Sequence, residues 1–357
     1  MMSRSFLLEK KSIALAALLA GAGSMAVAAG PTGDPGFLPK GAKVEALVDG
    51  KKHDLFFTEG PVATCDGKVL FTDIPVTMFK KGPNGWDVPS GQIMKYDPAT
   101  RAVSVFRSPS GMANGLRVDR DCNLVAAEGA DHGGRRVTRT DMKTGRTAIL
   151  TASYGGRPYN APNDVAIDGK GRIYFSDPRY MGTEKVEQDV QAVYRIDKDG
   201  KVAQIVKDAA KPNGLALCPG DKHLFVVAHD NGTTDLAKAG DPATVKGPMA
   251  ILQYDLDEQG NASNRRVLVD YAPADGPDSM TCDAEGNLWV AVRDAKRPGV
   301  YAYRVNNGKA EEKAYIPLPA LPTNVGFGRG KNASYLYITA GNGLYGVRTG
   351  KKGHHPQ

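Results

Sequence analysis

The sequence predicts an all-β fold, a six-bladed β-propeller, and three observations support that prediction. A motif of two short strands around a polar turn occurs six times, with copies starting at Glu59, Asn114, Asn163, Asn213, Asp278 and Asn324. The starts are 46 to 65 residues apart, which suits one four-stranded blade per copy. Glycine accounts for 42 of the 357 residues, as expected where many tight turns join short strands.

Alternating apolar patterns between the copies indicate a third strand in several blades. They lie at Gly91–Asp97, Ala192–Asp197, Ala250–Leu256 and Gly299–Val305. After the sixth copy only the strand pattern GLYGVRT, residues 343–349, remains, so that blade lacks an outer strand. Residues 42–49 (AKVEALVD), just before the first copy, are predicted to supply it and to seal the ring, which removes an exposed sheet edge. We therefore expect one propeller domain over residues 30–350.

The two ends of the chain do not follow the repeat. Residues 1–29 are typical of a secretory signal peptide, with a basic start, an apolar stretch at Ser12–Ala22 and a small-x-small pattern at Ala26–Ala28. A membrane anchor is the alternative, but the apolar stretch is short for a spanning helix. We expect a secreted or periplasmic protein without a stable membrane anchor. Residues 351–357 (KKGHHPQ) are polar and terminal, and we expect a disordered tail there.

The charged residues exclude one class of partner. The formal net charge is +7, but Lys and Arg are interspersed with acids and form no basic stripe among aromatic residues. Such a distribution is typical of a solvated surface, and we expect no nucleic-acid partner.

Four cysteines follow the first residues of their motif copies at similar distances. Cys65 and Cys122 fall in neighbouring blades, as do Cys218 and Cys282. Disulfides within these two pairs are one hypothesis, and buried free thiols are the other.

The first residue of each motif copy opens the strand that should lie innermost in its blade. All six are therefore expected to face one another around the propeller axis. They comprise two carboxylates, Glu59 and Asp278, and four asparagines. Such a set suits a hard cation, Ca²⁺ first, with Mg²⁺, Mn²⁺ or Zn²⁺ as alternatives, and a cation would offset the cost of burying these groups. Alternatively, the asparagines only cap strands or form Asn-Gly turns, as at Asn114 and Asn213.

Six segments together form a specific pattern over the mature chain. They are TEGPV at 58–62, GGRRVTR at 133–139, APNDVAID at 161–168, YFSDPRY at 174–180, PNGLAL at 212–217 and GPDSMTCDAEGNLWVA at 276–291. With them the chain resembles the SMP-30/gluconolactonase family, which includes regucalcin and bacterial gluconolactonases, with diisopropyl fluorophosphatase as a relative on the same fold. The resemblance implies a six-bladed propeller with a metal site.

The resemblance also implies roles for particular residues. Motif by motif, the metal ligands would be Glu59, Asn163, Asn213 and Asp278. The substrate would then contact Asn114, Asn324, His132, Arg179 and Tyr180. Of these, His132 lies in a loop where bacterial gluconolactonases carry a histidine, and Arg179 and Tyr180 lie in a loop on the same face.

Two positions depart from the family pattern. Ser279 follows Asp278 where glycine is usual, and its hydroxyl would contact substrate or simply be tolerated. Ala161 stands where vertebrate lactonases carry an arginine, so recognition of sugar hydroxyls should differ.

The resemblance implies a metal-dependent hydrolase that opens a sugar lactone to the aldonic acid. Asp278 would be the catalytic residue, as general base or direct nucleophile, unless it is only a ligand. The alternatives are another metal-dependent esterase or phosphotriesterase-like hydrolase, or a non-catalytic binding propeller of the periplasm. The expected partner is a small-molecule lactone or ester.

Overall fold

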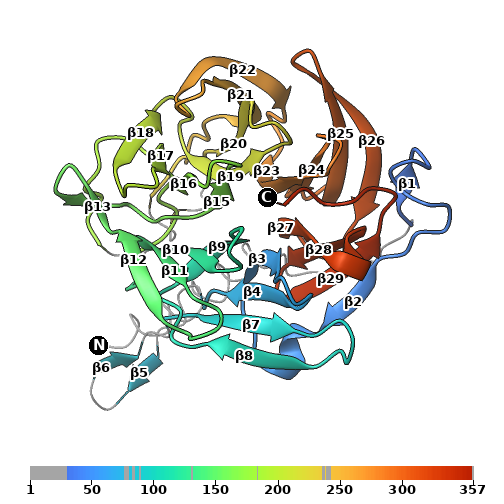
Figure 1. The fold of residues 1–357 in the computed structure, drawn as a ribbon, viewed down its shortest axis with the longest axis horizontal. Helices are drawn as coiled ribbons and strands as arrows, with labels where there is room; N and C mark the ends of the chain where they lie inside the picture. Colours follow the sequence, from blue (N-terminus) through green and yellow to red (C-terminus); the bar gives the residue numbers. More distant parts are fainter. Residues whose placement is uncertain are drawn as a thin grey trace.

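Six antiparallel sheets are arranged around one axis in the computed structural model (Figure 1). The structure describes residues 30–75, 80–82, 85–87, 90–129, 132–182, 184–234, 238 and 243–355. The predicted six-bladed propeller is confirmed. The predicted signal peptide, residues 1–29, lies outside the described residues. In the described part of the chain, no helix has the length and apolar character needed to cross a membrane.

Each blade contributes four strands, ordered from the axis outward. Blade 1 contains β3 (Thr58–Ala63), β4 (Val69–Asp73), β7 (Gln92–Tyr96) and β8 (Val103–Arg107). Blade 2 contains β9 (Ala113–Val118), β10 (Leu124–Glu128), β11 (Arg136–Thr140) and β12 (Thr147–Thr151). Blade 3 contains β15 (Val165–Ile167), β16 (Ile173–Asp177), β17 (Ala192–Ile196) and β18 (Val202–Val206).

The second half of the ring is built in the same way. Blade 4 contains β19 (Pro212–Leu217), β20 (His223–His229), β21 (Met249–Leu256) and β22 (Ala262–Asp270). Blade 5 contains β23 (Pro277–Cys282), β24 (Leu288–Val292), β25 (Gly299–Asn306) and β26 (Lys309–Pro317), with β1 (Thr32–Gly33) added outside. Blade 6 contains β27 (Pro322–Phe327), β28 (Tyr335–Ala340), β29 (Gly343–Arg348) and β2 (Glu45–Val48).

Short elements complete the chain. One hairpin, β5 (Lys80–Gly82) with β6 (Gly85–Asp87), lies between the second and third strands of blade 1. Another, β13 (Ser153–Tyr154) with β14 (Arg157–Pro158), lies between blades 2 and 3. Two 3₁₀ turns, η1 (Gly50–His53) and η3 (Gly330–Asn332), lie after β2 and β27.

The ring is closed by the strand that the sequence predicts. β2 pairs with β29 in an antiparallel register, Glu45 opposite Gly346, so the N-terminal part of the chain supplies the outer strand of blade 6. Each innermost strand also contacts the next one around the axis, including β27 with β3. The apolar core lies between neighbouring sheets, where for example Tyr174 of blade 3 packs in one cluster with Leu215 of blade 4.

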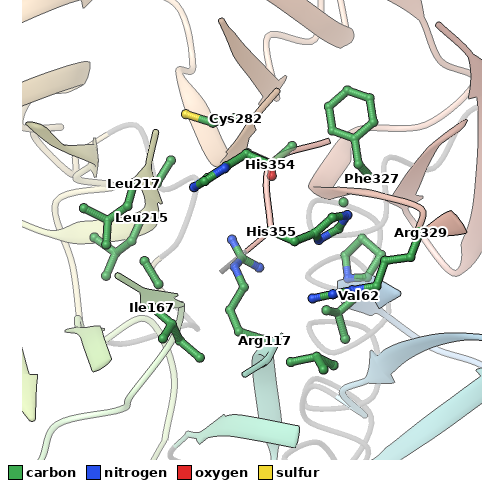
Figure 2. A pocket seen from close by; sticks show the side chains of 16 residues that line it. Val62, Arg117, Ile167, Leu215, Leu217, Cys282, Phe327, Arg329, His354 and His355 are labelled. Carbon is green, nitrogen blue, oxygen red and sulfur yellow. The ribbon is translucent and has the colours of Figure 1, made fainter. Parts of the chain in front are cut away.

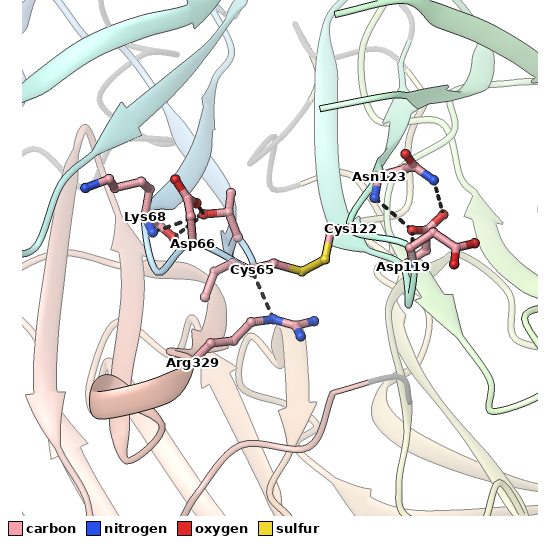
Figure 3. Close-up of a disulfide and its surroundings, with 10 residues drawn as sticks. Cys65, Asp66, Lys68, Asp119, Cys122, Asn123 and Arg329 are labelled. Atoms are coloured by element: carbon pink, nitrogen blue, oxygen red, sulfur yellow. Dashed lines mark hydrogen bonds between the residues drawn. A yellow bond between two sulfur atoms is a disulfide. The ribbon is translucent and has the colours of Figure 1, made fainter. Parts of the chain in front are cut away.

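Both predicted disulfides are present. Cys65 in the β3–β4 turn is bonded to Cys122 in the β9–β10 turn, joining blades 1 and 2 (Figure 3). Cys218 and Cys282 join blades 4 and 5 in the same way. All four lie toward the ends of the innermost strands, at the face of the propeller opposite the residues that open these strands. We call this the lower face, and the face where the strands open the upper face.

Acidic residues at the ends of second strands hold the segments that enter the innermost strands. Asp73 accepts hydrogen bonds from the backbone N–H groups of Phe56 and Phe57. Asp177 does the same for Asn160 and Ala161, at 2.9 and 2.8 Å. These carboxylates therefore fix the approach of the chain to the axis in blades 1 and 3.

The chain end is ordered as far as His355, so the prediction of a disordered tail is wrong for residues 351–355. Its backbone forms hydrogen bonds with two blades. In blade 5, the Ala284 N–H donates to the Lys352 carbonyl oxygen, and the His354 N–H donates to the Cys282 carbonyl oxygen. In blade 6, the Gly353 N–H donates to the Ala333 carbonyl oxygen. The tail thereby crosses the lower end of the axis, and the C-terminus lies at the centre of the ring (Figure 1). Residues 356–357 lie outside the described part.

Removing residues 351–357 should lower stability. Three backbone hydrogen bonds and the ion pair of Lys351 with Glu285 would be lost. At about 1 kcal/mol for each hydrogen bond, the melting temperature should fall by several degrees. Removing only residues 356–357 is the control. Equal melting temperatures for both truncated proteins would show that the tail does not join the blades.

The pH dependence of stability should report on Asp177. Burial raises the pKa of this carboxyl to about 7 despite the two backbone donors. The folded protein then holds one proton more than the unfolded chain between about pH 4 and 7, so this group's contribution is full below pH 4 and is lost as pH rises through 7. Urea midpoints at pH 5 and pH 7 should differ less in Asp177→Asn than in the wild type. An equal change of the urea midpoint with pH in both proteins would show that Asp177 does not cause this pH dependence.

Candidate functional site

We use the term axial ring for the six residues that open the motif copies. Five of them lie in innermost strands, and Asn163 lies two residues before β15. In five of the innermost strands the pairing with the second strand shifts register near the ring residue. The shifts follow Glu59 and Ala113 and precede Leu215, Met280 and Asn324. A bulge of this kind redirects a side chain out of the regular strand alternation. The ring side chains can therefore converge at the axis.

Glycine next to the ring lets neighbouring blades approach closely. A Cβ atom at Gly60 would lie 2.2 Å from the Asn114 carbonyl oxygen. At Gly115 it would lie 2.6 Å from Asp164 Cα, and at Gly214 it would lie 2.4 Å from Ser279 Cα. No side chain fits in these contacts, so the glycines set the narrow width of the ring.

The two carboxylates of the ring are buried together. Asn213 donates Nδ2–H to Asp278 Oδ1 at 2.7 Å, and Arg293 donates to Asp278 Oδ2 at 3.2 Å. Glu59 accepts from the Gly60 N–H at 3.1 Å. Burial, and then the charge of Asp278, raises the pKa of Glu59 well above its usual value. Two carboxylates that disfavour each other's ionisation are held here in one small space.

The remaining contacts of this cluster are amide and imidazole groups. A hydrogen bond from Asn324 partly offsets the rise in the pKa of Glu59. Burial raises the pKa of Asp278, and the nearby Arg293 and His229 oppose that rise. Glu59, Asn213, Asp278 and Asn324 are thus brought together as predicted.

Asp164 is a residue that the sequence reasoning missed. Its carboxylate is fully buried, and Oδ2 accepts from the Leu215 N–H at 3.0 Å and from the Ser279 hydroxyl at 2.7 Å. The bonded groups follow Asn213 and Asp278 in the chain, so Asp164 ties blade 3 to blades 4 and 5 directly beside the ring. The sequence left open whether the Ser279 hydroxyl contacts substrate or is simply tolerated. In the structure this hydroxyl donates to the Asp164 carboxylate.

A cleft adjoins the ring on the upper face. Two ring residues, Asn114 and Asn163, line it together with Tyr180. The Tyr180 hydroxyl donates to the His229 carbonyl oxygen at 2.8 Å, which fixes the phenol against blade 4. The other walls of the cleft are apolar and include Ile74, Met112, Pro162 and Met181. Asn114 and Tyr180 thus line one cleft, and their contact with substrate stays a prediction.

Two further predicted substrate contacts differ in their exposure. His132 is exposed in its loop, and its backbone N–H donates to Glu184 Oε1 at 2.8 Å. Its substrate contact stays a prediction. Arg179 is only 1% exposed, and its guanidinium donates to the backbone carbonyls of Asn160 and Glu184. Arg179 is therefore enclosed by the loop that it holds, and its contact with substrate stays a prediction.

The donor set fits a divalent cation. The buried Oδ1 of Asn114 accepts no hydrogen bond from any described residue, which leaves an oxygen donor for another partner. Two carboxylates and several amide oxygens match the ligands that Ca²⁺ prefers. Among the described residues no three His, Cys, Asp or Glu side chains form a metal site by themselves, so a cation here would depend on the amide oxygens.

Comparison with known proteins identifies the family. The model of the SMP-30/gluconolactonase/LRE-like region matches residues 57–342, which include the whole axial ring. The chain belongs to this family. The resemblance found in the six sequence segments is therefore confirmed.

Relatives in the family match most of the chain. A gluconolactonase of Zymomonas mobilis is 28% identical over 316 residues, covering 83% of this chain and 79% of the relative. The pentonolactonase XacC of Haloferax volcanii is 26% identical over 288 residues, covering 80% and 81%. The solved structure of a gluconolactonase from Xanthomonas campestris shares the fold, with a TM-score of 0.71 at 23% identity over 91% of this chain and 96% of that one.

Removal of the Ser279 hydroxyl should destabilise the protein. In Ser279→Ala the buried Asp164 carboxylate loses a donor, and we expect a loss of about 1.5–3 kcal/mol in the free energy of unfolding. Ser263→Ala, on the exposed outer strand β22, is the matched control and should change stability by about 0.5 kcal/mol or less. Urea denaturation measures both, and equal losses would rule out a special role for the Asp164 contact.

Proposed function

We propose that this chain is a divalent-cation-dependent lactonase that hydrolyses a sugar lactone to the aldonic acid. The observation that supports it best is the buried pair Glu59 and Asp278, bonded to Asn213 at the axis of a propeller from a family with lactonase members. Glu59, Asn163, Asn213 and Asp278 would hold the ion, with Ca²⁺ as our first choice. When bound, the ion would act as a Lewis acid on the lactone carbonyl.

The chain's own residues account for the rest of the reaction. Asp278 is the proposed general base: it takes a proton from the attacking water as the oxygen of that water bonds to the lactone carbonyl carbon. The ring C–O bond then breaks, and the leaving alkoxide takes up the proton that Asp278 received and becomes a hydroxyl. Arg293 holds Asp278 Oδ2 at 3.2 Å and so orients the other carboxylate oxygen.

The cleft supports a place for the substrate. Asn114 and Tyr180 line it beside the ring, so they are the proposed contacts for substrate oxygens. Asn324 contacts Glu59, and we propose that it orients this carboxylate. The apolar walls at Ile74, Met112 and Met181 favour one second candidate function, that of a metal-dependent esterase for less polar lactones or esters.

We also propose that the protein is exported. Both disulfides suit an oxidising compartment such as the periplasm or the cell exterior, where such bonds form and persist. Residues 1–29 would act as the signal peptide.

Hydrolysis of aldonolactones by the mature protein tests the proposal. We expect turnover with Ca²⁺, its loss with a chelator, and its recovery with Ca²⁺, Mg²⁺, Mn²⁺ or Zn²⁺ according to the native ion. Asp278→Asn should lower kcat/KM about 100-fold or more, since general base catalysis contributes at least that much. Asp199→Asn, in an exposed turn, is the matched control. An aryl ester and an apolar lactone in the same panel test the second candidate.

Each outcome of this panel has a clear meaning. Turnover that persists with chelator and in Asp278→Asn would overturn the proposed mechanism. Tight Ca²⁺ binding by calorimetry, weakened in Asp278→Asn but without turnover of any substrate, would favour a binding propeller instead.

A further inference from the structure

A second cavity lies at the lower end of the propeller axis. Val62, Leu217 and Phe327, near the ends of three innermost strands, form part of its apolar wall. Four basic side chains complete it: Arg117 from β9, Arg329 from the segment after β27, and His354 and His355 from the tail. Figure 2 shows both guanidinium groups and the His355 ring turned toward the same space. The proposed lactonase reaction uses none of these residues.

Arg329 brings charge that no described carboxylate neutralises, and Arg117 shares the Asp164 carboxylate with two neutral donors. Arg329 donates Nε–H to the Ala63 carbonyl oxygen at 3.2 Å, beside the Cys65–Cys122 disulfide (Figure 3), and no described carboxylate lies within ion-pair distance of it. Burial lowers the pKa of Arg329. For Arg117 the carboxylate within reach is Asp164, at 4.0 Å, and that group already accepts from Leu215 and Ser279. The cavity is therefore positively charged.

The tail adds two imidazoles to this site. His355 Nε2 lies 2.9 Å from the Gly328 carbonyl oxygen, so this nitrogen carries the proton and donates it. Burial, followed by the charge of Arg329, lowers the pKa of His355 to about 4, and His354 and Arg117 act in the same direction. Burial also lowers the pKa of His354, which Asp221 partly offsets. Both rings are neutral near pH 7.

We propose that this cavity binds a small oxyanion of the phosphate or carboxylate class. Guanidinium groups present paired N–H donors in the geometry that such oxygens accept, and half-buried cations without a counter-charge are costly. A metal cation is excluded by the two arginines. The site is separate from the ring because its lining lies toward the ends of the innermost strands, whereas the ring residues lie near their starts.

Anion binding should strengthen at lower pH. Protonation of His354 or His355 adds positive charge beside the ligand, and the ligand in turn favours that protonation. The groups that face them are Arg117 and Arg329 around His355, and Asp221 near His354. We therefore expect sulfate, whose charge does not change over this range, to bind more tightly at pH 4.5 than at pH 7.5.

Titration of the chelator-treated full chain with inorganic phosphate tests the site. At constant ionic strength, phosphate should raise the melting temperature and give a calorimetric binding signal. Arg329→Gln should weaken binding roughly ten-fold, because it removes charge-assisted hydrogen bonds, and Arg329→Lys should fall between the two. Arg146→Gln, in an exposed turn, makes the same charge change elsewhere and should bind as the wild type does.

Titrations with other anions and other variants identify the class of ligand and the place where it binds. A response to phosphate and sulfate but not acetate identifies a tetrahedral oxyanion, and an equal response to acetate identifies a carboxylate. Binding that is kept in Asp278→Asn places the anion away from the axial ring. If Arg329→Gln does not fold, His355→Ala serves in its place, with loss of the pH effect as the readout. No signal from the wild type, or equal signals from wild type and Arg329→Gln, would overturn the proposal.

Discussion

The burial of two carboxylates at one axis is the constraint on which the rest of this structure depends. Glu59 and Asp278 reach the axis from blades 1 and 5, where water is scarce and like charges are close. Such groups are tolerated only when each oxygen has a partner. The amide of Asn213, the guanidinium of Arg293 and the glycine contacts between neighbouring strands supply those partners and the space for them. Asn213 belongs to blade 4 and Arg293 to blade 5, so these neighbouring blades have to pack together before Asp278 is satisfied.

Much of this arrangement could be predicted because it repeats. Each motif copy places one polar residue at the start of its innermost strand, so six local patterns in one register define both the ring and its position in the fold. The sealing strand at 45–48 could be predicted for a related reason, since the last copy lacked an outer strand and an unpaired segment preceded the first. For the cysteines, the neighbouring blades suggested two pairs, but the sequence left buried free thiols open, and the structure decides for the disulfides.

The features that sequence reasoning missed depend on contacts between distant segments. Asp164 directly follows Asn163, for which the motif predicted a role as metal ligand. Its partners Leu215 and Ser279 belong to other blades, so the sequence does not show these contacts. Arg179 sits in a loop beside the ring, as a substrate contact would, but the backbone at Glu184 folds over it. The tail has no apolar pattern, and its order comes from main-chain groups of blades 5 and 6, which no composition argument can detect.

Ring closure through β2 and β29 also bears on how the protein is made. The two strands are far apart in the sequence, so their pairing has to wait until all six motif copies and β29 have been synthesised. Contacts between such distant segments form late because of the loop entropy that they cost. An incomplete chain would present two open sheet edges, and edges of this kind invite aggregation or proteolysis. Only a polypeptide that contains both β2 and β29 can therefore cover these last sheet edges.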